Sequence, residues 1–211
     1  MKVLNLHAGR GGNRKLWEGV EVTAVEIDPE LVRMYKEDFP EDEVIEGDAD
    51  EYLLKNYKRF DFIWGSPPCP KNSRPRFWSA KGNDAVSDEY PDLTLYMYKI
   101  FLDHWYSGKY SLENVDPYYK PLIPPTKKIG RHLFWTNFPI GHFNHIQTDC
   151  SGNTVAQMEK IHGISIHGYK GKQRKDKIIR NCVHPETGLY ILDCAREIIR
   201  KQNVEQLDIF D

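Results

Sequence analysis

Short apolar runs alternate with amphipathic stretches along the first half of the chain. Runs with the character of buried strands occupy residues 2–6, 21–27, 44–48, 59–64 and 110–115. Between them, the spacing of apolar residues and a proline at a first helical position predict helices ending at residue 17, beginning at residue 29, and spanning 50–57 and 88–107. Strands and helices in alternation indicate an α/β protein built on a doubly wound, mostly parallel sheet.

The pattern weakens in the second half of the chain. A proline-rich connection over 117–125 leads to a further strand at 132–135. Helical spacing returns at 154–161 and again at 185–202. The tract 142–177, part of it polar and basic, is the best candidate for an appended or mobile element. No firm boundary divides the 211 residues, so we expect a single domain.

Composition narrows the class of protein. With 29 Lys and Arg against 31 Asp and Glu, the formal net charge is −2, which gives no indication of non-specific nucleic-acid binding but is compatible with a local basic face. No stretch approaches the roughly 20 apolar residues that span a bilayer. The chain enters its first strand without a basic and apolar leader. We therefore expect a cytoplasmic protein without membrane contact, whose four scattered cysteines form no disulfides.

Glycines and carboxylates follow the predicted strands, where open α/β sheets bind ligands. The first strand is followed by His7-Ala8-Gly9-Arg10-Gly11-Gly12, whose glycines allow a ligand to approach the backbone. Glu26 ends the second strand, where its carboxylate can accept hydrogen bonds from ribose hydroxyls. Asp48 ends the third and can accept from an adenine amine. This pattern indicates a nucleoside-type cofactor; a simple packing turn is the alternative. Since the glycines match neither the dinucleotide fingerprint nor a phosphate loop, S-adenosylmethionine is favoured over NAD or ATP.

The fourth strand leads into Gly65-Ser66-Pro67-Pro68-Cys69-Pro70. Each proline fixes its own φ and pushes the preceding residue toward extended geometry. Such a segment holds Cys69 rigidly and presents its sulfur. Taken alone, the segment leaves two interpretations open: a reactive thiol, or a buried and inert cysteine.

Taken together, these segments resemble the DNA (cytosine-5)-methyltransferase family. The glycine turn after Leu4-Asn5-Leu6, then Glu26, Asp48, the Pro-Pro-Cys segment and Glu113-Asn114-Val115 stand in the order of that family. The resemblance extends from Val3 to Phe138 and resumes at Arg180-Asn181-Cys182-Val183, which is similar to the family's last motif. The compact spacing is most similar to short phage members. The resemblance implies a Rossmann-like fold with a reduced or absent target recognition domain.

The resemblance also implies a chemistry and a set of site residues. The Cys69 thiolate would attack C6 of a cytosine flipped out of the duplex, Glu113 would contact N3 and the exocyclic amine, and Arg131 would reach the base carbonyl. The family has an Arg-x-Arg pair here, whereas this chain offers Arg131 and His132, so the register is open. S-adenosylmethionine would be bound by His7, Ala8, Gly9, Gly11, Glu26, Ile27, Asp48, Ala49, Pro67, Asn181 and Val183. The DNA substrate would be contacted by Pro68, Asn114, Arg74 and Arg76.

This interpretation divides the chain into a cofactor and catalytic core over 1–140, a rudimentary recognition or mobile segment over 141–178, and a C-terminal helix over 179–211 that completes the cofactor pocket. The abbreviated recognition region raises the possibility of a partner protein that supplies recognition. It also motivates an alternative function, a methyltransferase-like accessory protein that binds cofactor or DNA without turnover. Amino-methylation of adenine or cytosine is disfavoured, because that chemistry uses an aromatic residue where Cys69 stands. We expect no metal site, since His142, His145 and Cys150 have no evident fourth ligand.

Overall fold

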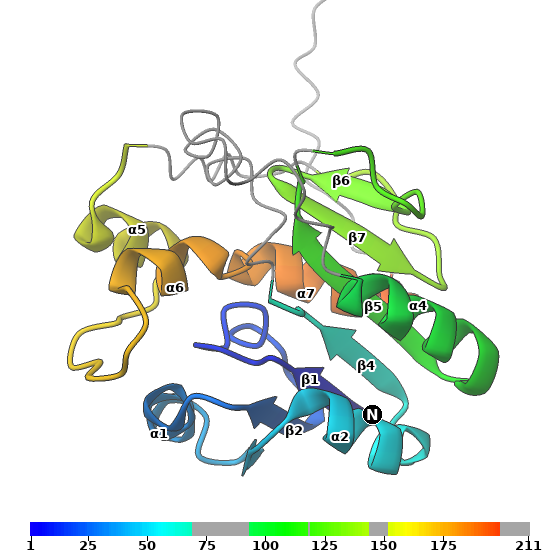
Figure 1. Cartoon of the computed structure of the whole chain (residues 1–211), viewed down its shortest axis with the longest axis horizontal. Coiled ribbons are helices and arrows are strands. Elements are labelled where there is room, and N and C mark those ends of the chain that lie inside the picture. Colours follow the sequence, from blue (N-terminus) through cyan, green and yellow to red (C-terminus); the bar gives the residue numbers. More distant parts are fainter. Residues whose placement is uncertain (69–92, 118, 144–151, 199–211) are drawn as a thin grey trace, which may run out of the picture.

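A computed structural model describes residues 1–68, 93–117, 119–143 and 152–198 of the chain (Figure 1). Within them, one seven-stranded sheet has the order β3-β2-β1-β4-β5-β7-β6. The first five strands run parallel, and β7 runs antiparallel to both β5 and β6. The strands are β1 Lys2–Leu6, β2 Glu21–Glu26, β3 Glu43–Glu46, β4 Phe62–Gly65, β5 Lys109–Val115, β6 Lys127–Ile129 and β7 His132–Thr136. The predicted doubly wound, mostly parallel sheet is therefore confirmed.

Helices cover both faces of this sheet. They are α1 Pro29–Asp38, α2 Ala49–Asn56, α4 Thr94–Trp105, α5 Val155–His162, α6 Lys175–Asn181 and α7 Pro185–Ala195, with a 3₁₀ turn, η1, at Tyr57–Arg59. On one face, apolar residues of α2 and α4 pack with β1, β4 and β5. On the other, α7 packs over β1, β2 and β4. Because both faces are covered, the central strands β1, β4 and β5 are buried along almost their whole length.

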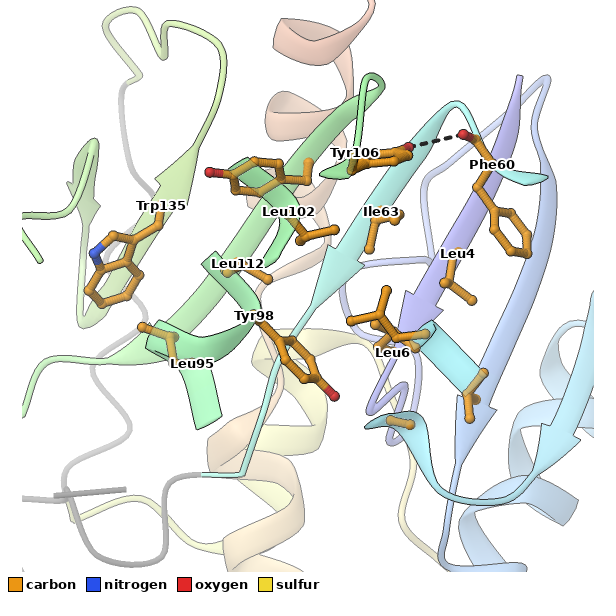
Figure 2. Close-up of a cluster of buried hydrophobic side chains, with 14 of the residues drawn as sticks. Leu4, Leu6, Phe60, Ile63, Leu95, Tyr98, Leu102, Tyr106, Leu112 and Trp135 are labelled. Atoms are coloured by element: carbon orange, nitrogen blue, oxygen red, sulfur yellow. Dashed lines mark hydrogen bonds between the residues drawn. The ribbon is translucent and has the colours of Figure 1, made fainter. Parts of the chain in front are cut away.

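Figure 2 shows the core under α2 and α4. Leu4, Ile63 and Leu112 come from three adjacent strands and meet Leu102 of α4. At the edge of this core the Tyr106 hydroxyl donates a hydrogen bond of 3.0 Å to the carbonyl oxygen of Phe60. The core thus fixes β4 and β5 side by side, so that the segments following them emerge at the same edge of the sheet.

The prediction of a helix after the first strand was wrong. Residues 7–17 form successive turns, with hydrogen bonds from Gly11 N to Ala8 O, Arg14 N to Gly11 O and Trp17 N to Arg14 O at 2.9–3.0 Å. Gly9 and Gly11 have φ of +54° and +70°, outside the right-handed helical region. These glycines precede the predicted helix, and the turns continue beyond them to residue 17, with hydrogen bonds that span three residues instead of the four of an α-helix.

Other elements differ in their limits. Strand β6 was not predicted, and α6 begins within the tract 142–177, which we expected to be an appended or mobile element. The predicted helix at 154–161 is α5, where Thr154 caps the first turn in a capping box with Gln157. In the described part of the chain, no helix combines the length and apolarity needed to cross a membrane.

Candidate functional site

A cavity of about 200 Å³ opens at the carboxyl ends of β1, β2 and β4. A second cavity, beside α4 and β7, measures about 10 Å³ and could hold no more than a water molecule. The larger cavity is lined by eight of the residues singled out in the sequence: His7, Ala8, Gly9, Glu26, Ile27, Pro68, Asn181 and Val183. Residues more than 170 positions apart along the chain are therefore brought to one site.

Glu26 is the acidic group of this cavity. It ends β2, is only 8% exposed, and accepts three backbone hydrogen bonds. Gly9 N–H donates to Oε2 at 2.8 Å, while the N–H groups of Ile27 and Asp28 donate to Oε1 at 2.9 and 3.0 Å. Burial raises the pKa of Glu26, and these hydrogen bonds partly offset the effect. The carboxylate is thus held rigidly at the end of β2 and bonded to the glycine turn.

The glycines of the turn serve different purposes. A Cβ on Gly9 would meet nothing within 4 Å, so its backbone faces the open cavity. A Cβ on Gly12 would lie 2.6 Å from the carbonyl oxygen of Val183, so the turn packs directly against the connection between α6 and α7. A Cβ on Gly11 would lie 2.5 Å from the Phe39 ring and 2.9 Å from the Tyr35 ring, so this glycine packs against the end of α1.

Three other predicted cofactor residues, Asp48, Ala49 and Pro67, do not line the cavity. Asp48 is exposed and caps α2, accepting a hydrogen bond of 3.0 Å from Glu51 N. Ala49 is buried in the first turn of the same helix. Pro67 lies on the loop after β4, and its carbonyl oxygen accepts a hydrogen bond of 3.1 Å from Asn114 Nδ2.

His7 joins the cavity to α4. It is the first residue after β1, has a φ of +55°, and its Nε2 lies 3.1 Å from the Tyr98 hydroxyl. That hydroxyl donates to Asp50, so His7 is the donor to Tyr98. Burial lowers the pKa of His7 to about 4, against the opposing charges of Asp50 and Asp48. His7 is therefore a neutral ring in the cavity wall at neutral pH.

Glu113 and Asn114 lie on β5, which neighbours β4. Glu113 is 4% exposed, and its Oε1 contacts Nδ1 of His132, the first residue of β7. Asn114 uses both ends of its amide: Nδ2 donates to the Pro67 carbonyl, and Oδ1 accepts from Val115 N at 2.8 Å. The Glu-Asn pair is therefore tied to β7 on one side and to the loop before Cys69 on the other.

The register of β7 separates Arg131 from His132. Cα partners are Glu113 with Phe134 and Val115 with His132, and alternate residues of a strand share a face. His132 therefore points to the Glu113 side of the sheet, whereas Arg131 precedes the strand, in the turn from β6. Arg131 contributes its carbonyl oxygen to Asp116 N at 2.9 Å. The structure thus brings His132, and not Arg131, into contact with Glu113.

Part of the tract expected to be a recognition or mobile segment walls the cavity. Gln173 and Ile178 line it, and Gln173 Nε2 donates to Asp28 at 3.1 Å. Tyr169, whose hydroxyl donates to the same carboxylate at 2.6 Å, packs with Leu31 of α1. We did not identify Gln173 or Ile178 from the sequence, since nothing local marks a polar loop as part of a pocket more than 140 residues away.

Buried Arg10 links the glycine turn to α1 and to Ser165, which precedes the residues of the cavity wall. Its guanidinium donates to the carbonyl oxygens of Ser165 at 3.0 Å and Met34 at 2.9 Å, and pairs with Asp38 at 2.7 Å.

Five residues that were singled out in the sequence lie outside the described residues: Cys69, Arg74, Arg76, His145 and Cys150.

The chain was compared with protein families, curated sequences and solved structures. Residues 1–118 match the sequence model of the C-5 cytosine-specific DNA methylases, and no curated protein sequence matches the chain. Among solved structures, the Entamoeba histolytica methyltransferase EhMeth is 12% identical over 95% of this chain and 99% of its own, with a TM-score of 0.51. That likeness shows the fold alone.

Two further structures match over a smaller part of the chain. A mutant of Spodoptera frugiperda DNMT2 is 24% identical over 55% of this chain and 35% of its own, with a TM-score of 0.38. A putative DNA modification methyltransferase encoded within an Escherichia coli prophage is 22% identical over 57% and 33%, with a TM-score of 0.37. The matched part of the chain corresponds to about a third of each of these two proteins.

Proposed function

Because the chain belongs to the C-5 cytosine-specific DNA methylase family, we propose that it transfers a methyl group from S-adenosylmethionine to C5 of cytosine in DNA. The observation that carries this proposal is the position of the cavity. Its lining runs from the buried Glu26 carboxylate to Pro68, the residue before Cys69. A cofactor bound by the Glu26 carboxylate would thus lie next to the segment that carries Cys69.

The cavity fits a nucleoside cofactor by three features. Of the roughly four acceptor sites of the Glu26 carboxylate, three accept backbone N–H groups, which leaves one on Oε2 for a ribose hydroxyl. The Ile27 side chain lines the cavity and is 66% exposed, an apolar surface that an adenine ring would cover. Gly9 leaves its backbone open to a ligand. S-adenosylmethionine, when bound, supplies an electrophilic methyl group.

Cys69 is the proposed nucleophile. Its thiolate sulfur forms a bond to C6 of the cytosine, which makes C5 nucleophilic toward the methyl group. Loss of the C5 proton and breakage of the bond between sulfur and C6 then restore the ring and free the thiolate. Because C5 and C6 are inaccessible in a stacked duplex, the base is flipped out of the helix.

Glu113 is the proposed base-binding residue. Its contact with N3 and the exocyclic amine stabilises charge that develops when C6 is attacked, and it selects cytosine over thymine. Asn114 supports the same site, because its hydrogen bond to Pro67 links β5 to the loop that carries the nucleophile. Arg131, Arg74 and Arg76 remain proposed contacts to the base and to DNA phosphates.

Mechanism-based trapping tests this proposal. Duplex DNA with 5-fluorocytosine at many sequence contexts is incubated with the protein and S-adenosylmethionine. Fluorine at C5 cannot leave as a proton does, so the sulfur–C6 adduct should persist on a denaturing gel. Cys69→Ser should abolish the adduct, whereas Cys194→Ser, a matched cysteine on α7, should not. Cofactor binding without any adduct would contradict the proposal and support the accessory role instead.

A further inference from the structure

We propose that His132 is the positioning residue for Glu113, fixing one carboxyl oxygen so that the other is directed to the target base. The inference deepens the proposed function and rests on it. In this proposal the two oxygens of the Glu113 carboxyl group have different partners: Oε1 contacts His132, and Oε2 contacts the target base.

The sheet itself creates the contact. Glu113 lies in β5 and His132 begins β7, which pairs antiparallel with β5. The side chains of His132 and Glu113 are 7% and 5% exposed, so the pair is nearly withdrawn from water. Because both residues sit in adjacent, hydrogen-bonded strands, the position of the Nδ1 atom is set by backbone pairing and not by a flexible loop. Geometry of that kind can hold a carboxyl group in one orientation.

His132 is the hydrogen-bond partner that the described residues offer to the carboxyl group of Glu113. Among the described residues, Nδ1 of His132 is the hydrogen-bond partner of Oε1, and none of them bonds Oε2. A carboxyl group held at one oxygen cannot rotate without losing that bond. With Nδ1–H donating to Oε1, Oε2 is the oxygen that remains to contact N3 and the exocyclic amine of cytosine.

A further histidine lies within electrostatic range of His132. The ring of His162 lies 5.9 Å from the ring of His184, between centroids, and the charge of His132 acts on His162. Burial, and then the charges of His184, His132 and Arg131, lower the pKa of His162 to about 4. The ring of His162 is therefore neutral at neutral pH. It carries no positive charge that would compete with His132 for the Glu113 carboxylate.

The arrangement also explains a departure from the family pattern. The resemblance implied arginine near this position, and Arg131 was the residue we selected from the sequence. Because alternate residues of a strand share a face, His132 and not Arg131 lies on the same face of the sheet as Glu113. The imidazole of His132 then holds the acid, and the expected contact of Arg131 with the base carbonyl stays a separate proposal.

Two variants of similar shape isolate the hydrogen bond. His132→Asn retains an N–H donor near the position of Nδ1, whereas His132→Leu has the same branching without a donor. We expect the leucine variant to lower kcat for methyl transfer to DNA by about 10- to 100-fold, the range for losing a hydrogen bond to a charged group. Its S-adenosylmethionine affinity should change less than about twofold, and the asparagine variant should retain kcat within about threefold of wild type.

A double-variant cycle distinguishes positioning from general packing. In the Glu113→Gln background, adding His132→Leu should lower kcat by no more than about threefold, because the group that His132 positions is already impaired. An undiminished loss in that background, or equal losses for leucine and asparagine, would overturn the inference. Should the leucine variant not fold, His132→Gln, which displaces the donor by one methylene, takes its place. Wild-type kcat in that variant would equally overturn the inference.

The controls separate this inference from the proposed function. An inactive wild-type protein with intact cofactor binding would overturn the proposed function and this inference together. An active wild type that loses activity in Glu113→Gln but not in His132→Leu would overturn this inference alone.

Discussion

Replacing Glu26 by glutamine should disrupt the cavity at a side chain that accepts three backbone hydrogen bonds. A glutamine has one accepting oxygen and one donating nitrogen, whereas three N–H groups point at the two oxygens of Glu26. The least costly orientation keeps the oxygen toward Ile27 and Asp28 and turns the amide nitrogen toward Gly9 N–H. One charge-assisted hydrogen bond is then lost, and two donors face each other.

The expected magnitude follows from this count. A lost hydrogen bond to a charged group costs about 1.5–3 kcal/mol. The substitution also removes a buried negative charge, whose cost is visible in the raised pKa of Glu26, so part of the loss is offset. We expect the free energy of unfolding to fall by about 1–2 kcal/mol. Affinity for S-adenosylmethionine should fall about tenfold or more, because an acceptor for the ribose becomes a donor.

Urea unfolding measures the first quantity and isothermal titration calorimetry the second. Glu46→Gln is the matched control: Glu46 pairs with Glu26 across β2 and β3 but is exposed. This control should change both quantities by less than about 0.5 kcal/mol, as expected for a surface site. Equal effects of the two substitutions, or unchanged cofactor affinity in Glu26→Gln, would refute the reasoning.

Three further predictions concern other parts of the site. Gly12→Ala places a methyl group 2.6 Å from the Val183 carbonyl oxygen, so urea unfolding should show a loss of about 1–3 kcal/mol, and an unchanged midpoint would contradict the close packing. The pKa of His7 is lowered to about 4, so the unfolded chain binds this proton first and stability should fall between pH 6.5 and 4, by at most about 3 kcal/mol. His7→Asn, which tolerates positive φ and does not titrate, should make that decline shallower; an identical pH profile would count against the assignment. Asn114→Asp removes the donor to the Pro67 carbonyl, so methyl transfer should slow by about tenfold while calorimetry shows nearly unchanged cofactor affinity. Fully retained activity would show that this link is dispensable.

Local sequence was sufficient for most of the fold because the parallel strands are short runs rich in apolar residues, separated by amphipathic stretches. It was not sufficient for β6, whose three residues include two lysines and follow a proline-rich connection. It was misleading after β1, where the chain up to residue 17 forms turns whose hydrogen bonds span three residues instead of a helix. In each case the deciding factor was pairing with β7 or backbone conformation, neither of which hydrophobic periodicity records.

The candidate site was predictable to the same extent. Residues at strand ends could be selected because parallel strands end at one edge of a sheet. Whether Arg131 or His132 meets Glu113 is a question of one residue in strand register, which only the pairing of β5 with β7 answers. Gln173 entered the cavity wall through contacts with Asp28 that no local pattern signals.

The central claim concerns which atom receives the methyl group. DNA incubated with the wild-type protein and isotopically labelled S-adenosylmethionine can be digested to nucleosides and analysed by mass spectrometry. The account predicts label in 5-methylcytosine, and none when Cys69→Ser replaces the wild type. Label in an amino-methylated base, or label that survives that substitution, would contradict it.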